Sequence, residues 1–324
     1  MAAAASVSKS LLLVPGFLCL LAPASISMAQ LSPSFYSETC PALEDIVALT
    51  MTPAVLLNPR TAAFILRLFF HDCFVNGCDA SVLLDDTPTF TGEKNAGPNA
   101  NSLGGFEVID DIKTAVELLC PGTVSCADIL ALAVRDGVAL LGGPSWTVPL
   151  GRRDTTTASQ SAANRDLPGP GSTLAQLVAA FAAKGLSARE MTALSGAHTI
   201  GLARCVNFRA HVFGDADVDP DFATQLRESC PASGGDDGLA PLDEQTATAF
   251  DNAFYGNLVA FRGLLHSDQE LFNNGSSQES LVRRYAADNG AFARDFAAAM
   301  VRMGNISPLT GSDGEIRLDC RRVN

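Results

Sequence analysis

Apolar residues recur at helical spacing along most of the chain, and short clusters of glycine and proline separate the segments in which they do so. Runs in which apolar and polar residues alternate, the pattern of a half-buried strand, are scarce. We therefore predict an all-α fold. Its expected helices cover residues 41–52, 61–74, 106–119, 126–141, 173–184, 187–198, 247–261 and 278–303.

Two polar residues interrupt the second of these helices, which is otherwise apolar on nearly all sides, as in a helix buried in a large core. Arg67 and His71 stand four residues apart and so share one face. A buried cation is costly unless another group pairs with it. Taken alone, Arg67 is best explained as a buried residue paired with a carboxylate, and His71 as a core histidine with a hydrogen-bond partner. Together, and followed at once by the oxygen-rich loop 72–81, they indicate a site for a polar reactant and a metal ion.

A second histidine closes the helix predicted over 187–198. Ser187 and Glu190 form a capping box that starts this helix, and Gly201 follows its end. Apolar residues one and two turns earlier place His198 on the core-facing side. A lone histidine there is more often a satisfied core residue than a metal ligand. None of the four histidines lies in the His-Glu-x-x-His pattern of zinc proteases.

Both histidine segments resemble one family. Residues 67–81 are similar to the distal helix and calcium loop of the secreted plant (class III) haem peroxidases, and Leu194–Gly201 is similar to the segment that carries their proximal haem ligand. The resemblance runs from Gln30 to Asn324. It implies one haem peroxidase domain over 30–324, with a single haem b between two helical lobes.

The residue types suit the chemistry that the resemblance implies. Splitting hydrogen peroxide needs a base that takes a proton from one oxygen and returns it to the other, and an imidazole can do both. The resemblance gives this role to His71 and the stabilising of developing charge to Arg67. It makes Asn99 the acceptor that orients His71. His198 becomes the axial haem ligand, supported by the carboxylate of Asp268.

Calcium is the metal that we expect. Carboxylate, hydroxyl and carbonyl oxygens crowd residues 72–81, as a hard cation requires, although the spacing is not that of an EF-hand. The alternative is a solvated acidic turn without a metal ion. It is disfavoured because the clustered carboxylates lie beside an apolar helix and need a cation to offset their charge. The first expected site comprises Asp72, Val75, Gly77, Asp79, Ser81 and, through a water, Glu93. The resemblance implies a second calcium site at Thr199, Asp243, Thr246, Ala249 and Asp251.

The first 29 residues predict a secretory signal. They carry one charge, Lys9, then an apolar run over 11–21, and end in small residues before Gln30, where we expect cleavage. A membrane anchor is the alternative, but glycine and proline interrupt a run that is already too short to span a bilayer. The chain ends four residues after Cys320, so the resemblance favours the extracellular space or apoplast over the vacuole.

Cysteine usage agrees with secretion. Eight cysteines remain once Cys19 leaves with the signal, and an even number in a secreted chain argues for four disulfides. Only Cys73–Cys78, which closes a turn-forming loop, is nearly forced by spacing. The resemblance implies Cys40–Cys120, Cys126–Cys320 and Cys205–Cys230. A zinc site would need close cysteine or histidine pairs that the chain lacks.

Length and charge limit the partners. With 324 residues, 47% of them hydrophobic, the chain can bury a large core, and its net charge of −13 will not attract nucleic acid or anionic wall polymers. We expect a monomer that has neither a nucleic-acid nor a membrane partner. Its substrates by resemblance are hydrogen peroxide and small phenolic donors, the latter beside Pro168. Asn274 begins a plausible glycosylation sequon, and Asn305 a poorer one because Pro308 follows it.

The sequence thus predicts a secreted haem peroxidase that reduces hydrogen peroxide to water and oxidises phenols in one-electron steps. Expected roles are hydrogen peroxide removal, the response to oxidative stress and oxidation of lignin or other wall phenols. A calcium- and haem-binding structural protein without catalysis is one alternative, disfavoured because all five catalytic and haem-site residues are present. A secreted metallohydrolase is another, contradicted by the missing zinc spacings.

Overall fold

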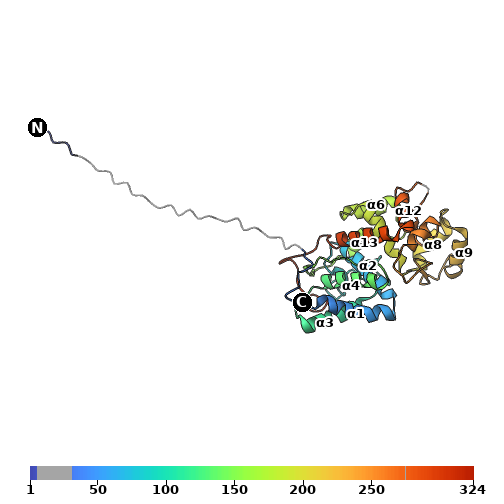
Figure 1. The fold of residues 1–324 in the computed structure, drawn as a ribbon, viewed down its shortest axis with the longest axis horizontal. Helices are drawn as coiled ribbons and strands as arrows, with labels where there is room; N and C mark the ends of the chain where they lie inside the picture. The colour runs from blue at the N-terminus through green and yellow to red at the C-terminus, as the bar shows by residue number, and fades with distance from the viewer. Residues whose placement is uncertain (6–30, 274) are drawn as a thin grey trace.

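The computed structural model describes residues 1–5, 31–273 and 275–324. The predicted signal, apart from residues 1–5, and Asn274 lie outside the described residues. The described chain is mainly helical (Figure 1). Its elements are α1 (Leu43–Leu57), α2 (Arg60–Cys73), η1 (Ser81–Leu83), α3 (Phe106–Leu119), α4 (Cys126–Leu140), α5 (Gln160–Asp166), α6 (Leu174–Ala183), α7 (Ala188–Ser195), η2 (Gly196–Thr199), β1 (Leu202–Arg204), α8 (Cys205–Gly214), α9 (Pro220–Ser229), β2 (Leu239–Pro241), α10 (Ala253–Val259), α11 (His266–Gln269), α12 (Glu279–Ala287) and α13 (Asn289–Met303).

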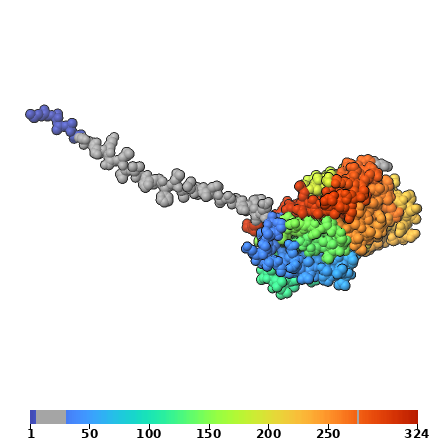
Figure 2. All heavy atoms as spheres, in the orientation of Figure 1, coloured from blue at the N-terminus to red at the C-terminus, as the bar shows by residue number. Residues whose placement is uncertain are grey.

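The helices form two groups. In the first group, α1 and α2 pack against α4, and α3 packs against both α1 and α4; in the second, α7 contacts α6, α12 and α13, while α10 packs on α12. Figure 1 shows α1, α3 and α4 on one side and α6, α8, α9 and α12 on the other, and the surface in Figure 2 divides in the same way. One apolar core runs through both groups. The expected all-α, two-lobed fold is confirmed.

Residues 202–241 add a smaller unit with an apolar core of its own. The antiparallel strands β1 and β2 close it, with Ala203 opposite Ala240, and a disulfide joins the start of α8 to the end of α9. Asp219 accepts a hydrogen bond from the Phe222 N–H at 2.9 Å and so caps α9, whose first residue is proline. This pairing of strands brings the segment after η2 next to the segment before Asp243.

Several helix predictions were wrong in extent. The helix expected over 278–303 is divided at Asp288, whose side chain accepts from the Ala291 N–H and starts α13. The helix expected from residue 247 begins only at Ala253, because the preceding residues form turns in which side chains bind one another. The sequence pattern also failed to predict α5, α8, α9 and α11. His198 lies in the 3₁₀ turn η2 rather than in an α-helix.

The structure contains the four disulfides that the resemblance implied, Cys40–Cys120, Cys73–Cys78, Cys126–Cys320 and Cys205–Cys230. Cys126–Cys320 spans the greatest sequence separation and holds the C-terminal segment at the start of α4. Arg321 then donates to both carboxylate oxygens of Asp110 in α3, each at 2.9 Å. None of the helices in the described residues has the length and apolar character that a transmembrane span needs.

A buried ion pair joins distant segments of this core. Arg152 and Asp128 are 1% and 0% exposed, and the guanidinium donates to Asp128 Oδ1 at 2.8 Å. The second carboxylate oxygen accepts from the hydroxyl of Tyr36 at 2.9 Å, while Arg152 also donates to the Gly304 carbonyl at 2.6 Å. The pair therefore links the N-terminal segment, α4 and the end of α13. Every charge in it has partners, as a buried pair requires.

Replacing Arg152 with Met should lower the free energy of unfolding by about 3–5 kcal/mol, because Asp128 would remain buried without its cation. Guanidinium unfolding followed by circular dichroism, with the disulfides intact, measures the loss. Arg165→Met is the matched control, since Arg165 pairs with Asp166 while 68% exposed. The control should change stability by less than about 1 kcal/mol. Similar losses in the two variants would show that the buried pair has no special weight.

Candidate active site

Arg67 and His71 lie on one face of α2, as their spacing predicted. The guanidinium of Arg67 donates to His71 Nε2 at 3.2 Å, and to the carbonyl oxygens of Ser102 and Pro98, each at 2.8 Å. Backbone carbonyls rather than a carboxylate thus satisfy this cation, so its positive charge stays uncompensated beside the imidazole. Burial lowers the pKa of Arg67 to about 10, which still leaves it protonated near neutral pH.

Asn99 fixes the tautomer of His71. Its Oδ1 lies 2.5 Å from His71 Nδ1, and its Nδ2 donates to the Glu93 carbonyl at 2.8 Å, which sets the direction of the amide. Since an amide oxygen can only accept, Nδ1 carries the proton and the Nε2 lone pair faces Arg67. Burial and then the charge of Arg67 lower the pKa of His71 to about 3, although the Asn99 bond opposes the shift. His71 is therefore neutral.

His198 has the same arrangement with a charged partner. Its Nδ1 lies 2.7 Å from Asp268 Oδ1, contributed by the short helix α11. Asp268 is 3% exposed, whereas His198 is 37% exposed, and nothing in the described residues makes a hydrogen bond to its Nε2. Separation from bulk water and the charge of Arg67 would both lower the pKa of His198, but Asp268 outweighs them and raises it.

The segment after His198 packs against α2. Gly201, with φ +103°, lies where an added Cβ would come within 3.2 Å of the Ala63 Cβ. The charge of Arg67 on α2 is near enough to oppose the rise in the pKa of His198. Half-buried Pro168, the expected donor-binding residue, belongs to a loop tied to α11. In that loop the Pro170 carbonyl accepts from the backbone N–H of Ser267, next to Asp268, at 3.0 Å.

The loop after His71 gathers buried oxygens. Burial and the neighbouring Asp79 raise the pKa of Asp72 well above its ordinary value, and burial raises that of Asp79 to about 6 and that of Glu93 to about 7. Ser81 Oγ and Glu93 Oε2 are buried and, within the part of the chain described, have no hydrogen-bond partner. Val75 and Gly77 are buried in the same loop. The cluster is short of positive charge and fits a cation with hard oxygen ligands.

A second oxygen cluster follows His198 directly. The hydroxyl of Thr199 lies 3.1 Å from Asp243 Oδ2 and 3.4 Å from Asp251 Oδ1, and that of Thr246 lies 3.1 and 3.0 Å from the same two atoms. Two hydroxyl protons cannot fill four such contacts at once. Ala249 joins this loop through its N–H, which donates to the Thr246 carbonyl at 2.8 Å. A cation between the carboxylates would remove the mismatch.

Comparison with known proteins gives one consistent result. The family model described as Peroxidase matches residues 47–288. Peroxidase 70 of Zea mays is 60% identical over 99% of this chain and 100% of its own length, and Peroxidase 4 of Vitis vinifera is 56% identical with the same coverage. The chain belongs to the plant class III haem peroxidases. This peroxidase is a haem-dependent oxidoreductase that uses hydrogen peroxide and a reducing substrate.

The donor set of this peroxidase fits haem. His198 offers an Nε2 lone pair that no described group takes up, and its carboxylate partner makes the imidazole a stronger ligand. His71 is neutral, and among the described residues it is bound only to Arg67 and Asn99. It has no carboxylate behind Nδ1, unlike His198, and so is less suited to bind iron. The two histidines therefore differ in their partners: His198 Nδ1 has a carboxylate behind it and His71 Nδ1 has a neutral amide.

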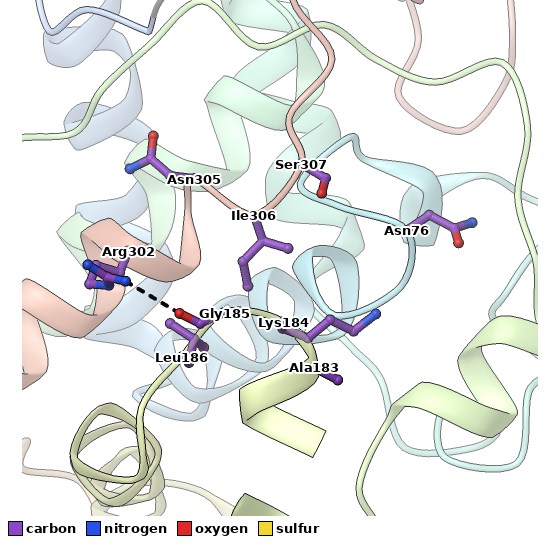
Figure 3. A pocket seen from close by; sticks show the side chains of 9 residues that line it. All are labelled: Asn76, Ala183, Lys184, Gly185, Leu186, Arg302, Asn305, Ile306 and Ser307. Carbon is purple, nitrogen blue, oxygen red and sulfur yellow. Dashed lines mark hydrogen bonds between the residues drawn. The ribbon is translucent and has the colours of Figure 1, made fainter. Parts of the chain in front are cut away.

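A pocket of about 630 Å³ elsewhere on the peroxidase contains none of these residues (Figure 3). It lies where the ends of α6 and α13 meet the loop that carries Asn76. Arg302 donates across the pocket to the Gly185 carbonyl at 3.4 Å. The two cationic side chains that line the pocket have acidic partners, Lys184 with Asp166 and Arg302 with Glu190. Asn305, the poorer predicted sequon, lines this pocket, and its glycosylation stays a prediction.

Sequence reasoning missed the groups that hold Arg67. They are the carbonyls of Pro98 and Ser102 and the Ser102 hydroxyl, the last at 3.1 Å. Every residue has a backbone carbonyl, so the residue type does not show which carbonyl will accept a hydrogen bond. Only the path of the chain after Glu93 could have identified these acceptors. The Glu93 carbonyl was missed in the same way, because the sequence singled out its carboxylate alone.

Replacing Asn99 with Ala should slow the reaction with hydrogen peroxide by about 10- to 100-fold, the usual effect of losing a group that orients a catalytic or ligating histidine. Without the acceptor, His71 is free to take the wrong tautomer. Stopped-flow absorption after mixing with peroxide measures the rate. Asn95→Ala in the same loop is the control, because exposed Asn95 bonds only to Asp86 among the described side chains. Equal rates for Asn99→Ala and the control would contradict the orienting role.

Proposed function

We propose that this peroxidase reduces hydrogen peroxide between Arg67, His71 and His198, and that small phenols supply the electrons in two one-electron steps. The observation that supports this assignment is the different partner behind each imidazole. His71 Nδ1 meets a neutral amide and His198 Nδ1 meets a carboxylate, each through a short hydrogen bond. Nε2 is left as the working atom of both rings.

Haem b supplies the redox chemistry when bound, taking up the two oxidising equivalents of hydrogen peroxide and passing them to the donor. His198 Nε2 would hold its iron. Asp268 keeps the proton of His198 on Nδ1, so that the ring presents a lone pair at Nε2, and the negative charge increases the basicity of that ring. The buried position of Asp268 preserves this effect by excluding competing water.

His71 acts as the proton carrier. Its neutral Nε2 takes a proton from one oxygen of hydrogen peroxide and returns it to the other as the O–O bond breaks and water leaves. Arg67 must release its hydrogen bond to Nε2 as peroxide enters, and its guanidinium then stabilises the negative charge that develops on the departing oxygen. Two donor phenols each give up one electron and one proton, which completes the second water.

The donors approach near Pro168. This residue is half-buried in a loop whose backbone is hydrogen-bonded to α11. The same helix carries Asp268, so α11 supports both the donor site and the His198–Asp268 pair. A half-buried proline offers an apolar surface on which the ring of a phenol can pack. We assign the enzyme to hydrogen peroxide removal, the response to oxidative stress and oxidation of lignin or other wall phenols.

Two calcium ions complete the site in this proposal. The first binds Asp72, Val75, Gly77, Asp79 and Ser81, with Glu93 through a water, and the second binds Thr199, Asp243, Thr246, Ala249 and Asp251. Each cluster follows an active-site histidine directly in sequence. The unpartnered Ser81 hydroxyl and the shared contacts of Thr199 and Thr246 support the assignment. We also propose secretion of residues 30–324 to the apoplast as a monomer.

Replacing His71 with Ala should slow peroxide reduction by about 10²- to 10⁴-fold, because no other described group can carry the proton. The haem absorption band should persist. Replacing His198 with Ala should instead shift or abolish that band. Absorption spectra and stopped-flow rates of the two variants test both roles together. A near-normal rate in the first, or an unchanged spectrum in the second, would contradict its role.

Removing calcium with a chelator should lower thermal stability and peroxidase activity together. Losing an ion that contributes about 3 kcal/mol would lower the unfolding midpoint by roughly 5 °C in a chain of this size. Metal analysis must verify removal, and added calcium should restore both properties. Asp243→Ala tests the second site alone and should remove one of the two ions. An unchanged midpoint and activity after verified removal would rule out a stabilising role for calcium.

A further inference from the structure

A second pair of imidazoles converges outside the active site. His211 of α8 and His266 of α11 both direct Nδ1 at one oxygen of Asp215, at 2.6 and 2.7 Å. The ligand-type atoms of these three side chains all lie within 4.8 Å of one another. They come from segments more than 50 residues apart in sequence, so the fold has to assemble them.

The outer nitrogens show which atoms are available. His211 Nε2 faces the Gly263 carbonyl at 3.2 Å, and a carbonyl can only accept, so this nitrogen carries a proton. In the neutral ring, Nδ1 then presents a lone pair to the carboxylate oxygen of Asp215. Two electron-rich atoms at 2.6 Å need a proton or a metal ion between them. His266 Nδ1 meets the same oxygen of Asp215, and its Nε2 lies 3.8 Å from Glu270 Oε1, near that carboxylate but not hydrogen-bonded to it.

Metal-binding histidines usually have such an acceptor behind the nitrogen that does not bind the metal. Here the Gly263 carbonyl accepts from His211, and the Glu270 carboxylate lies near the outer nitrogen of His266. We propose that His211 Nδ1, Asp215 and His266 Nδ1 bind a divalent transition metal, for which zinc is the best match. Zinc binds both imidazole and carboxylate, whereas calcium binds oxygen ligands and not imidazole, and a water would complete four-coordination.

The exposure of the three side chains suits this role. In a tetrahedral site with bonds of about 2.0 Å, ligand atoms lie roughly 3.3 Å apart, so Asp215 and His266 must draw back slightly. They are 28% and 29% exposed and have room to move, whereas His211 is 1% exposed and fixed. The same exposure gives the ion a path from solvent. Zinc binding would displace the protons now held between the rings and the carboxylate.

The test uses the full haem- and calcium-loaded enzyme, dialysed against zinc chloride and then analysed for metals. We expect one zinc per chain, and at least tenfold weaker binding in both Asp215→Asn and His266→Gln. Asp217→Asn is the matched control, a nearby acidic residue outside the cluster, and should bind zinc normally. The haem absorption band of each variant verifies folding. Zinc affinity should also fall as pH is lowered, because protons compete for both rings.

Crystals soaked in zinc and measured on both sides of the zinc absorption edge locate the ion. An anomalous peak between His211, Asp215 and His266 is the expected result, distinct from the haem iron. Three results would overturn the assignment: no retained zinc, zinc retention by the two cluster variants equal to that of the unmodified enzyme, or a peak at another site. Because peroxide reduction is measured separately on the same protein, a failure here would leave the proposed peroxidase mechanism untouched.

Discussion

The active site depends on fixing one proton on each of two imidazoles. Both His71 and His198 have Nδ1 bonded to a buried oxygen, which leaves Nε2 as the atom that meets the reaction. The partners differ in charge, and this difference gives the rings opposite character. An amide cannot offset the cost of a buried imidazolium next to Arg67, so the pKa of His71 falls, while the carboxylate of Asp268 raises that of His198. Two similar hydrogen bonds thus accompany opposite shifts in pKa, which agrees with the different roles that we propose for the two rings.

The surrounding structure holds these partners in place through the backbone. The Asn99 amide is oriented by the Glu93 carbonyl, and Glu93 in turn accepts from the backbone N–H of Ser159 at 2.9 Å. On the other side, the pairing of β1 with β2 brings Asp243 to Thr199, immediately after His198. Each imidazole is therefore anchored twice, once through its ring and once through the oxygen cluster that follows it in sequence.

Local signals made much of this predictable. The predicted capping box of Ser187 and Glu190 starts α7, and Arg67 and His71 share one face of α2 as their spacing predicted. Period and propensity do not report where a side chain binds across the fold, however. The His71–Asn99 and His198–Asp268 pairs span 28 and 70 residues, and only the family resemblance suggested them. The break at Asp288 was missed because a capping side chain overrode a continuous apolar pattern.

The short helix α11 connects the proximal pair with the second histidine cluster. His266 begins this helix and bonds to Asp215, and Asp268, two residues later, bonds to His198. One turn of backbone carries both side chains, so each hydrogen bond holds the same short segment. The bond from His266 to Asp215 therefore gives a second fixed point to the helix that carries the Asp268 carboxylate.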